Sequence, residues 1–267
     1  MSTLEVMIIA IVQGLTEFLP VSSSGHMVLT EALFGLKVPG ITLEIALHFG
    51  TFMSVLLVFR KEIIHILISF FTKIWKIRQI PLNYREDEWF RMAVLVLLSM
   101  IPAILVALFL RDFIEGLFES TRSVGIALIF TGLLLFITQW APRVRKPLKG
   151  WNVLFMGIFQ ALAMIPGISR SGSTISAGLL AGVDREKIAK FSFIMALPLI
   201  IGATILEIPE IKGGSQISLF NISLGMLVAF LTGIVALKWL IKILMRGRLS
   251  SFSYYCVLLG FITVALS

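Results

Sequence analysis

The chain has 267 residues, of which 58% are hydrophobic and 14% charged, and its formal net charge is +8. Soluble domains average about 45–50% apolar and about 25% charged residues, so a mean hydropathy of +0.99 excludes an ordinary soluble enzyme. The same composition excludes a disordered chain. The single cysteine, Cys256, excludes an intrachain disulfide and a cysteine-rich metal site. The composition is that of an integral membrane protein.

The first half of the chain begins with an interrupted apolar region, followed by three continuous ones. Residues 1–35 are broken by Gly, Pro and Ser, which predicts a re-entrant pair of half-helices, because irregular backbone at membrane depth must be buried in protein or line a cavity. A helix needs about 20 mostly apolar residues to cross the hydrocarbon. Residues 41–59, 90–110 and 123–141 predict such spans, and the mixed basic and aromatic segment 62–82 predicts an interfacial helix.

The second half of the chain repeats this order. Residues 151–182 are again apolar but broken by Gly, Pro and Ser, and they predict a second re-entrant pair. Three spans are predicted after it, at 190–208, 219–237 and 252–267.

Basic residues are concentrated in alternate connections between the spans. Eighteen of the 23 Lys and Arg residues lie in four groups, at 60–91, 143–149, 185–190 and 238–248, against three in the opposite connections. Because Lys and Arg accumulate on the cytoplasmic side, we expect all four groups to lie there. This requires that residues 151–182 enter the membrane from the cytoplasmic side and return to it. The basic excess therefore indicates topology and not a nucleic-acid surface.

A short internal repeat links the two interrupted regions. Gln13–Leu15 and Val21–Gly25 match Gln160–Leu162 and Ile168–Gly172 at a constant offset of 147 residues. Three spans follow each region. Because three is an odd number of crossings, the second copy begins on the opposite side of the membrane from the first and is inverted relative to it, as in inverted-repeat membrane proteins.

These patterns predict an all-α polytopic membrane protein with an inverted repeat. It has about six full transmembrane helices and two re-entrant helical regions. We expect a single membrane domain over 1–267, with repeat halves of approximately 1–145 and 146–267.

The first interrupted region carries a carboxylate, serines and an imidazole. Gln13 and Glu17 are four residues apart and share a helix face. After the proline that ends this helix, Ser22–Gly25 places backbone N–H groups and hydroxyls at a helix start, which suits phosphate. Ser23 and His26 are three residues apart, within reach of a nucleophile–base pair. Because ionisable residues inside a membrane are costly, we favour a functional site over helix caps and packing.

The second interrupted region carries an arginine among small polar residues. Arg170 is the only basic residue in a long apolar stretch, and its planar guanidinium fits phosphate oxygens. Ser169, Ser171 and Thr174 add hydroxyl donors, and Gly172 permits close approach. A structural ion pair between this arginine and Glu17 is the alternative, and it is compatible with a site.

Brought together by the repeat, the two regions form a mid-membrane site suited to phosphoryl transfer. Positioning and charge neutralisation supply most of the catalysis in that reaction. A divalent cation between Glu17 and phosphate oxygens would fit such a site.

The two motifs resemble those of the undecaprenyl-diphosphate phosphatases of the bacitracin-resistance type. That family's Glu/Gln-x-x-x-Glu motif corresponds to Gln13–Glu17 and continues as Phe-Leu-Pro-Val-Ser-Ser-Ser-Gly-His. Its Pro-Gly-x-Ser-Arg-Ser-Gly-x-Thr motif corresponds to Pro166–Thr174. The resemblance covers the whole chain in length and span pattern. Because the first motif position is Gln13, Glu17 is the only carboxylate of the motif, which weakens any mechanism that needs two.

The resemblance implies hydrolysis of undecaprenyl diphosphate to undecaprenyl phosphate and phosphate. It places this reaction at the outer, periplasmic face of the bacterial plasma membrane, where it recycles the lipid carrier for peptidoglycan synthesis and confers bacitracin resistance. The implied cofactor is a divalent cation, Mg²⁺ or Ca²⁺. The implied partners are the polyprenyl diphosphate substrate and membrane lipid, with no nucleic acid, and a homodimer is left open.

Roles for single residues follow from the motifs and this resemblance. The expected catalytic residues are Glu17, Ser23, His26 and Arg170. In this hypothesis Ser23 attacks the terminal phosphorus with His26 as base, and Glu17 binds the metal or relays a proton. Spacing does not exclude His26 as the nucleophile. The residues expected to bind substrate are Gln13, Ser22, Ser24, Gly25, Ser169, Ser171, Gly172 and Thr174.

Two other functions fit parts of the pattern. A transporter or flippase for the lipid phosphate fits the inverted repeat, but transport needs no nucleophile, so the serine and histidine favour an enzyme. A type-2 phosphatidic acid phosphatase shares the Ser-Gly-His element, but the rest of that signature is missing. Glu44 and His48, four residues apart at the head of a span, are interpreted as an interfacial pair, with a supporting role beside the site as the alternative.

Overall fold

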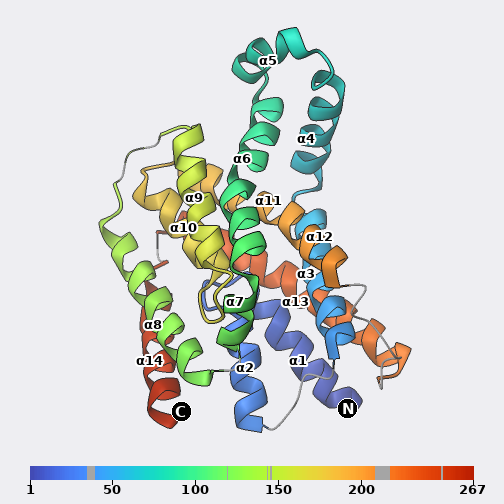
Figure 1. Cartoon of the computed structure of the whole chain (residues 1–267), viewed down its shortest axis with the longest axis vertical. Coiled ribbons are helices and arrows are strands. Elements are labelled where there is room, and N and C mark those ends of the chain that lie inside the picture. The colour runs from blue at the N-terminus through green and yellow to red at the C-terminus, as the bar shows by residue number, and fades with distance from the viewer. Residues whose placement is uncertain (35–39, 119, 143, 145, 208–216, 248) are drawn as a thin grey trace.

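The computed structural model consists of helices joined by turns and loops, with no β-strand, over the residues it describes, which are 1–34, 40–118, 120–142, 144, 146–207, 217–247 and 249–267 (Figure 1). The α-helices are α1 (Thr3–Thr16), α2 (Ser23–Phe34), α3 (Gly40–Val58), α4 (Arg60–Lys73), α5 (Ile80–Glu86), α6 (Glu88–Phe109), α7 (Arg111–Phe118), α8 (Thr121–Ile137), α9 (Gly150–Leu162), α10 (Arg170–Leu180), α11 (Arg185–Ile194), α12 (Ala196–Glu207), α13 (Leu219–Met245) and α14 (Ser251–Leu266). Short 3₁₀ turns lie at Ile77–Gln79 and Thr138–Trp140. The basic residues that lie outside the described ranges are Lys37, Arg143, Arg145, Lys212 and Arg248.

The described chain contains four helices that are long and apolar enough to cross a membrane. They are α6, α8 with the turn after it, the continuous pair α11–α12, and α13. A fifth candidate is α3 with α4, a pair bent by 82°. The sixth predicted span is α14, which is apolar but 16 residues long; at 1.5 Å per residue it covers about 24 Å. The prediction of an all-α polytopic membrane protein is confirmed.

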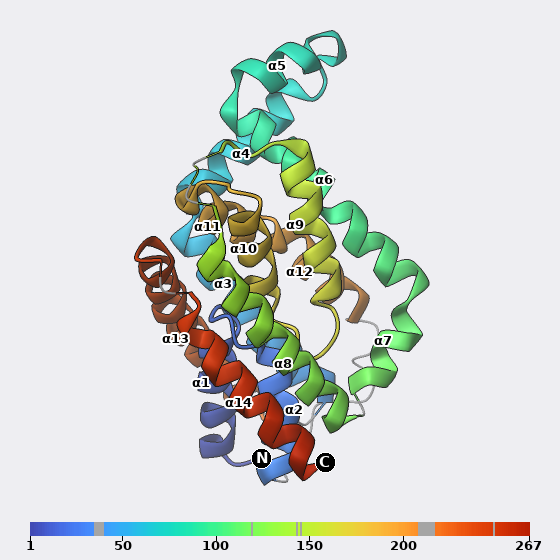
Figure 2. The same ribbon diagram turned by 90° about the vertical axis from the view of Figure 1, so that its left-hand side faces the viewer.

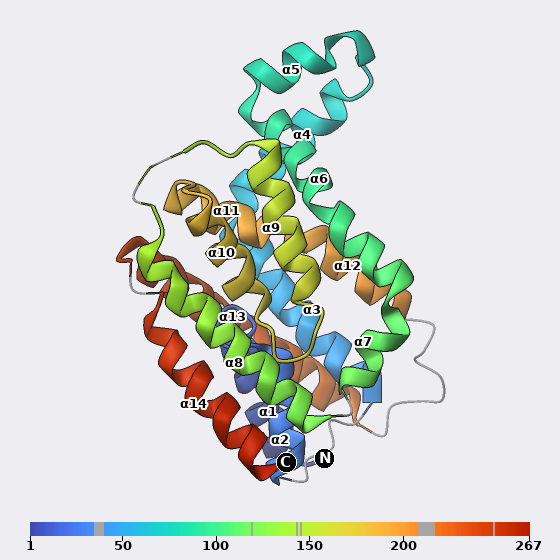
Figure 3. The ribbon, with the colours of Figure 1, turned by 60° about the vertical axis from the view of Figure 1, so that its left-hand side comes forward.

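Two broken hairpins enter the bundle from opposite ends, and their tips meet inside it (Figures 1 and 3). The first consists of α1 and α2 and the second of α9 and α10. Each tip contains one residue with positive φ: Ser22 at 68° and Gly167 at 95°. These conformations turn the chain back on itself, so the interrupted regions form helical hairpins as predicted.

The helices around the two hairpins pack in corresponding pairs. Helix α1 lies along α13, α9 lies along α6, and α8 lies along α14 (Figure 2). Glycines permit this close approach: a Cβ on Gly157 of α9 would lie 2.4 Å from the Ser99 carbonyl oxygen of α6. Small residues at helix interfaces are typical of membrane bundles. The pairing is consistent with the internal repeat, and the boundary between its halves near residue 145 stays a prediction.

Helices α4 and α5 and the start of α6 project from one end of the bundle (Figure 1). The Asp87 carboxylate holds this projection together: it accepts hydrogen bonds from Ser69 at 2.7 Å and from Lys73, and it caps α6 through the N–H groups of Trp89 and Phe90. Burial alone would raise the pKa of Asp87, but these donors, Lys73 first among them, hold it well below its ordinary value. The helical character predicted for this region is confirmed, and its interfacial position stays a prediction.

Candidate active site

The tips of the two broken hairpins are in van der Waals contact. A Cβ on Gly25 would lie 3.2 Å from the Cα of Gly167, and a Cβ on Gly172 would lie 3.2 Å from the Cβ of Pro20. The hydroxyl of Ser171 donates to a backbone carbonyl of the first tip at 3.3 Å. The two motifs are therefore brought together at one place, as the repeat predicts.

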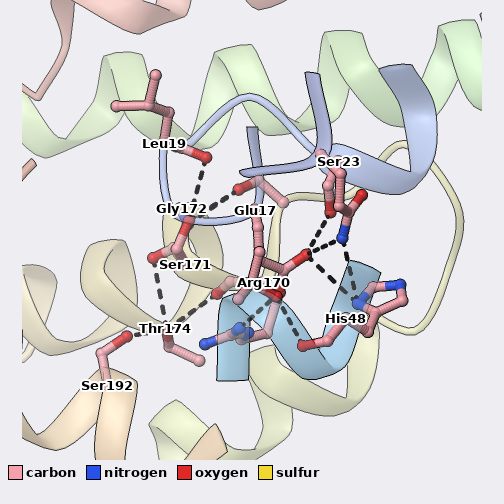
Figure 4. Close-up of polar contacts among 12 residues, drawn as sticks. Glu17, Leu19, Ser23, His48, Arg170, Ser171, Gly172, Thr174 and Ser192 are labelled. Atoms are coloured by element: carbon pink, nitrogen blue, oxygen red, sulfur yellow. Dashed lines mark hydrogen bonds and ion pairs between the residues drawn. The ribbon is translucent and has the colours of Figure 1, made fainter. Parts of the chain in front are cut away.

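Glu17 is the centre of the polar network between the tips (Figure 4). Its Oε1 accepts a hydrogen bond from Nη2 of Arg170 at 2.9 Å. Its Oε2 accepts from the Ser23 hydroxyl at 2.8 Å and from Nε2 of Gln13 at 3.1 Å, and Nδ1 of His48 lies 3.8 Å away. The Glu17 side chain is only 10% exposed. One buried carboxylate thus joins a cation from the second hairpin to a hydroxyl from the first.

The position of Glu17 follows from the way α1 ends. Glu17 caps α1, with its N–H donating to the Gln13 carbonyl at 2.9 Å. The next residue, Phe18, is fully buried and packs edge-on against Phe193, with ring centroids 5.8 Å apart. Because that ring is fixed in the core, the chain leaves α1 in one direction and turns the Glu17 carboxylate toward the second hairpin.

Helices α2 and α10 both begin at the junction, with corresponding serine caps. The Ser22 hydroxyl accepts a hydrogen bond from the Gly25 N–H at 3.2 Å, and the Ser169 hydroxyl accepts from the Gly172 N–H at 3.1 Å. Ser22 holds this position at a positive φ. Such a conformation in a residue other than glycine costs about 1–3 kcal/mol and clusters at functional sites. Two helix N-termini, which favour anions, are thereby brought together.

One half of the Arg170 guanidinium makes no hydrogen bond to the part of the protein that the structure describes. Nη2 pairs with Glu17, whereas the buried Nη1 has no hydrogen-bond partner among the described residues. The side chain is 16% exposed and stands in the first turn of α10. A buried N–H group without a partner is costly, so this nitrogen is suited to an anionic oxygen of a ligand.

His26 faces α14 and does not face Ser23. Its Nδ1 lies 2.8 Å from the Ser22 carbonyl oxygen, and its Nε2 lies 2.6 Å from the Tyr255 hydroxyl, with the two rings stacked. A carbonyl only accepts, so we assign the ring proton to Nδ1, and Nε2 accepts from Tyr255. The hydrogen bond expected between Ser23 and His26 is absent within the described structure, because the Ser23 hydroxyl turns to Glu17. Tyr255 stands in an apolar run, and no spacing pointed to it.

Other motif side chains hold the tips in place. The Thr174 hydroxyl lies 2.6 Å from that of Ser192, so it connects α10 to α11 and does not face Glu17. Ser24 pairs with Ser22, and Ser169 pairs with Ser171, each at 3.3 Å between hydroxyl oxygens.

Two polar residues inside the predicted spans prove to belong to the site. Thr131 of α8 donates to the Gly167 carbonyl at 3.0 Å and accepts from the Ser169 N–H at 3.1 Å. His48 lies 3.2 Å from Gln13, as well as near Glu17. The interpretation of His48 as part of an interfacial pair was therefore incomplete. A polar residue in an apolar span was the signal for both.

The chemistry of the site limits how it can hold a metal ion. Among the residues that the structure describes, no group of three or more His, Cys, Asp or Glu side chains is placed to bind one. Glu17 provides a single carboxylate, and the nearest other carboxylate, Glu44, lies beyond His48, whose Nε2 is 4.0 Å from it. Mg²⁺ often binds through one or two carboxylates together with substrate phosphates. Glu17 fits that mode as one ligand among phosphate oxygens.

Comparison with known proteins identifies the family. Residues 6–262 match the family model described as "Bacitracin resistance protein BacA". The chain belongs to the BacA family. The tips of both broken hairpins lie within the matched residues, so the region matched by the family model includes the Glu17 network.

Curated relatives of this BacA protein are similar along their whole length. The relative from Halothermothrix orenii, named undecaprenyl-diphosphatase, is 39% identical over 272 residues, covering 100% of this chain and 99% of the relative. Relatives of the same name from Carboxydothermus hydrogenoformans and Desulfatibacillum aliphaticivorans are 38% and 40% identical, each over 97% of this chain and over 95% and 97% of the relative.

The contact between the tips predicts the effect of Gly167→Ala. A Cβ there would lie 2.5 Å from the Val124 carbonyl oxygen, in a backbone conformation with φ of +95°. We expect destabilisation of at least about 2 kcal/mol and a melting temperature in detergent lowered by about 4–8 °C. Gly202→Ala is the control, because a Cβ there meets nothing within 4 Å. If Gly167→Ala had the same melting temperature as wild type, the close packing at the second tip would be contradicted.

Proposed function

We propose that this BacA-family protein is an undecaprenyl-diphosphate phosphatase, which releases phosphate from undecaprenyl diphosphate. The observation that carries the proposal is the buried Glu17 carboxylate, which contacts both the Arg170 guanidinium and the Ser23 hydroxyl. A phosphate-binding cation and a candidate nucleophile are thereby placed around one proton acceptor. The names of the curated relatives support the same activity.

The diphosphate would bind where the two hairpins meet. Nη1 of Arg170 is buried and available to a phosphate oxygen. The N-termini of α2 and α10 add backbone donors and a favourable dipole. The serine hydroxyls that now pair with each other, Ser22 with Ser24 and Ser169 with Ser171, can rotate to donate to phosphate.

In the proposed first step, Ser23 Oγ attacks the terminal phosphorus. The Oγ–P bond forms, the bond from that phosphorus to the bridging oxygen breaks, and the lipid monophosphate leaves. The Ser23 proton passes to Glu17 Oε2, which already accepts its hydrogen bond at 2.8 Å. Neutral Glu17 no longer competes for Arg170, so the guanidinium can neutralise charge on the phosphoryl group.

In the second step, water attacks the phosphoserine. A water oxygen–phosphorus bond forms while the Oγ–P bond breaks, Glu17 returns its proton to Ser23, and both protons of the water leave with the phosphate. We assign the base role to Glu17 because both ring nitrogens of His26 are already engaged, by Ser22 and Tyr255.

A divalent cation, Mg²⁺ or Ca²⁺, is part of the proposal. Glu17 would hold it together with diphosphate oxygens and water, through the carboxylate oxygen that does not accept the Ser23 proton. When bound, the cation would reduce the negative charge of the phosphates and so favour attack by the hydroxyl.

Phosphate release from undecaprenyl diphosphate by the purified protein tests the activity. We expect Glu17→Gln and Arg170→Ala each to lower kcat/KM by at least about 100-fold, because the first removes the proton acceptor and the second removes the cation that neutralises charge on the phosphoryl group. We also expect a chelator to abolish release and Mg²⁺ or Ca²⁺ to restore it. The exposed residues Glu86 and Arg122 provide matched controls, Glu86→Gln and Arg122→Ala, with activity within about threefold of wild type. Folded wild type that binds the lipid without releasing phosphate would favour the transporter.

Rapid quenching with substrate labelled in the terminal phosphate identifies the nucleophile. We expect a phosphoserine at position 23, no labelled intermediate in Ser23→Ala, and a loss in kcat of at least about 100-fold in that variant. Ser24→Ala, one residue away, should still form the intermediate. A phosphohistidine at His26 would contradict the mechanism and favour His26 as nucleophile.

We further propose that the site opens to the outer face of the bacterial plasma membrane and that the product is the lipid carrier for peptidoglycan synthesis. Helix α3 supports this orientation: the Glu44–His48 end lies at the site, and the opposite end leads at Arg60 into the basic projection. The family description supports a role in bacitracin resistance.

Labelling of an introduced cysteine tests the orientation. Lys146 is exposed and lies in a basic connection, so Lys146→Cys in a Cys256→Ala background should react only from the cytoplasmic side. Glu44→Cys in the same background is the control and should react from outside. Labelling of position 146 by an impermeant reagent in intact cells would overturn the proposed orientation.

A further inference from the structure

An apolar groove lies between α3 and α12, next to the candidate active site. Helices α3 and α12 pack against each other (Figure 1), and the groove between them has a volume of about 180 Å³. It is lined by Phe49 and Phe52 of α3 and by Ile200, Ile201, Thr204 and Ile205 of α12.

Helix α3 connects this groove directly to the polar network. Glu44 is 59% exposed, and His48, one turn further, reaches Glu17. Phe49 follows His48 in the chain, and Phe52 lies one further turn along the same side of the helix. At 1.5 Å per residue, about 6 Å of helix separates His48 from Phe52. The helix therefore passes from charged to polar to apolar side chains, in the order in which a lipid passes from head group to tail.

The groove is open to the surrounding lipid. Ile201 and Ile205 on its rim are 45% and 60% exposed, and α11–α12 is one of the helices apolar and long enough to span the membrane. A hydrocarbon chain can thus enter sideways from the bilayer without crossing water.

The far wall of the groove is coupled to the phosphate-binding hairpin. Ser192 of α11 bonds to Thr174 of α10 at 2.6 Å, and α10 begins with Arg170. Helix α12 follows α11 directly. One wall of the groove is therefore α3, which carries His48. The other wall is α12, which is linked through α11 to α10, the helix that carries Arg170.

We infer that this groove binds the isoprenoid unit next to the diphosphate of the substrate. The inference rests on the proposed function, which supplies a lipid with a diphosphate head. Its size admits this occupant: an apolar cavity of about 150 Å³ holds one benzene molecule, and a five-carbon isoprenoid unit has about the size of benzene, so a groove of about 180 Å³ has room for it. The rest of the prenyl chain lies in the bilayer.

Filling the groove with Thr204→Phe separates tail binding from head binding. We expect the KM for undecaprenyl diphosphate to rise about tenfold, with kcat within about twofold of wild type. Inorganic diphosphate carries no tail, so its inhibition constant should not change. Ile126→Phe is the matched control, because Ile126 is 56% exposed on α8, away from the groove; its KM should equal that of wild type.

Two other results would each overturn the inference. An unchanged KM in Thr204→Phe would mean that the groove holds bilayer lipid and no part of the substrate. An equal rise in the KM and in the inhibition constant would mean a distorted head site. Wild type is assayed alongside. If the proposed function is wrong, wild type itself will release no phosphate, and this result is distinct from the two outcomes above.

A substrate analogue tests the same inference in the unmodified protein. Undecaprenyl diphosphate with a photoreactive diazirine on its first isoprenoid unit should crosslink to α12, within residues 200–205. The same group on the last unit should not crosslink there. Crosslinks from the first unit to other helices alone would overturn the assignment, whether or not Thr204→Phe folds.

Discussion

The ion pair between Glu17 and Arg170 is the interaction on which the rest of this structure depends. Its partners are 153 residues apart in the chain and largely buried. A buried charge without a partner costs several kcal/mol, so each of these residues requires the other. The pair therefore joins the two broken hairpins at their tips. It also leaves Nη1 of Arg170 without a hydrogen-bond partner among the described residues, and it leaves Oε2 of Glu17 to accept from Ser23. Both atoms are therefore available for chemistry.

Broken helices inside a membrane expose backbone groups that must find partners within the protein. Here the partners are side chains of neighbouring elements. Thr131 of α8 bonds to both sides of the second tip, and the serine caps bond to the first backbone N–H groups of α2 and α10. Glycines at the junction let the two tips pack in van der Waals contact. Two helix N-termini are thereby held together inside the bundle, and this arrangement favours an anionic group.

The proposed substrate, a lipid diphosphate, has a charged head and an apolar tail, and α3 carries side chains suited to each. Its first turns carry Glu44 and His48 beside the polar network, and its next turn carries the phenylalanines of the groove. In such an arrangement, the binding of the tail positions the head, because both are held by one rigid helix. This is how binding energy remote from the reacting atoms can contribute to orientation at the phosphorus.

The sequence by itself determined the membrane class, the broken hairpins and the identity of the residues at their tips. These properties depend on composition and on spacing along one helix, which are local. Residues Glu17 and Arg170 could be recognised as a pair because an ionised group in an apolar stretch requires a partner. The contact between the tips was predictable from the repeat, since it follows from two copies of one motif.

Only the tertiary structure decided which groups contact one another around that pair. Ser23 and His26 have the right spacing for a nucleophile and its base, yet Ser23 turns to Glu17 and His26 stacks on Tyr255. Thr174 belongs to a motif suited to phosphate binding, but its hydroxyl bonds to Ser192. In each case the partner comes from another element, which is six residues away in the chain for Ser23, 18 for Thr174 and 229 for His26. Spacing places side chains on a helix face, but packing between helices determines what that face meets, and no local pattern contains that information.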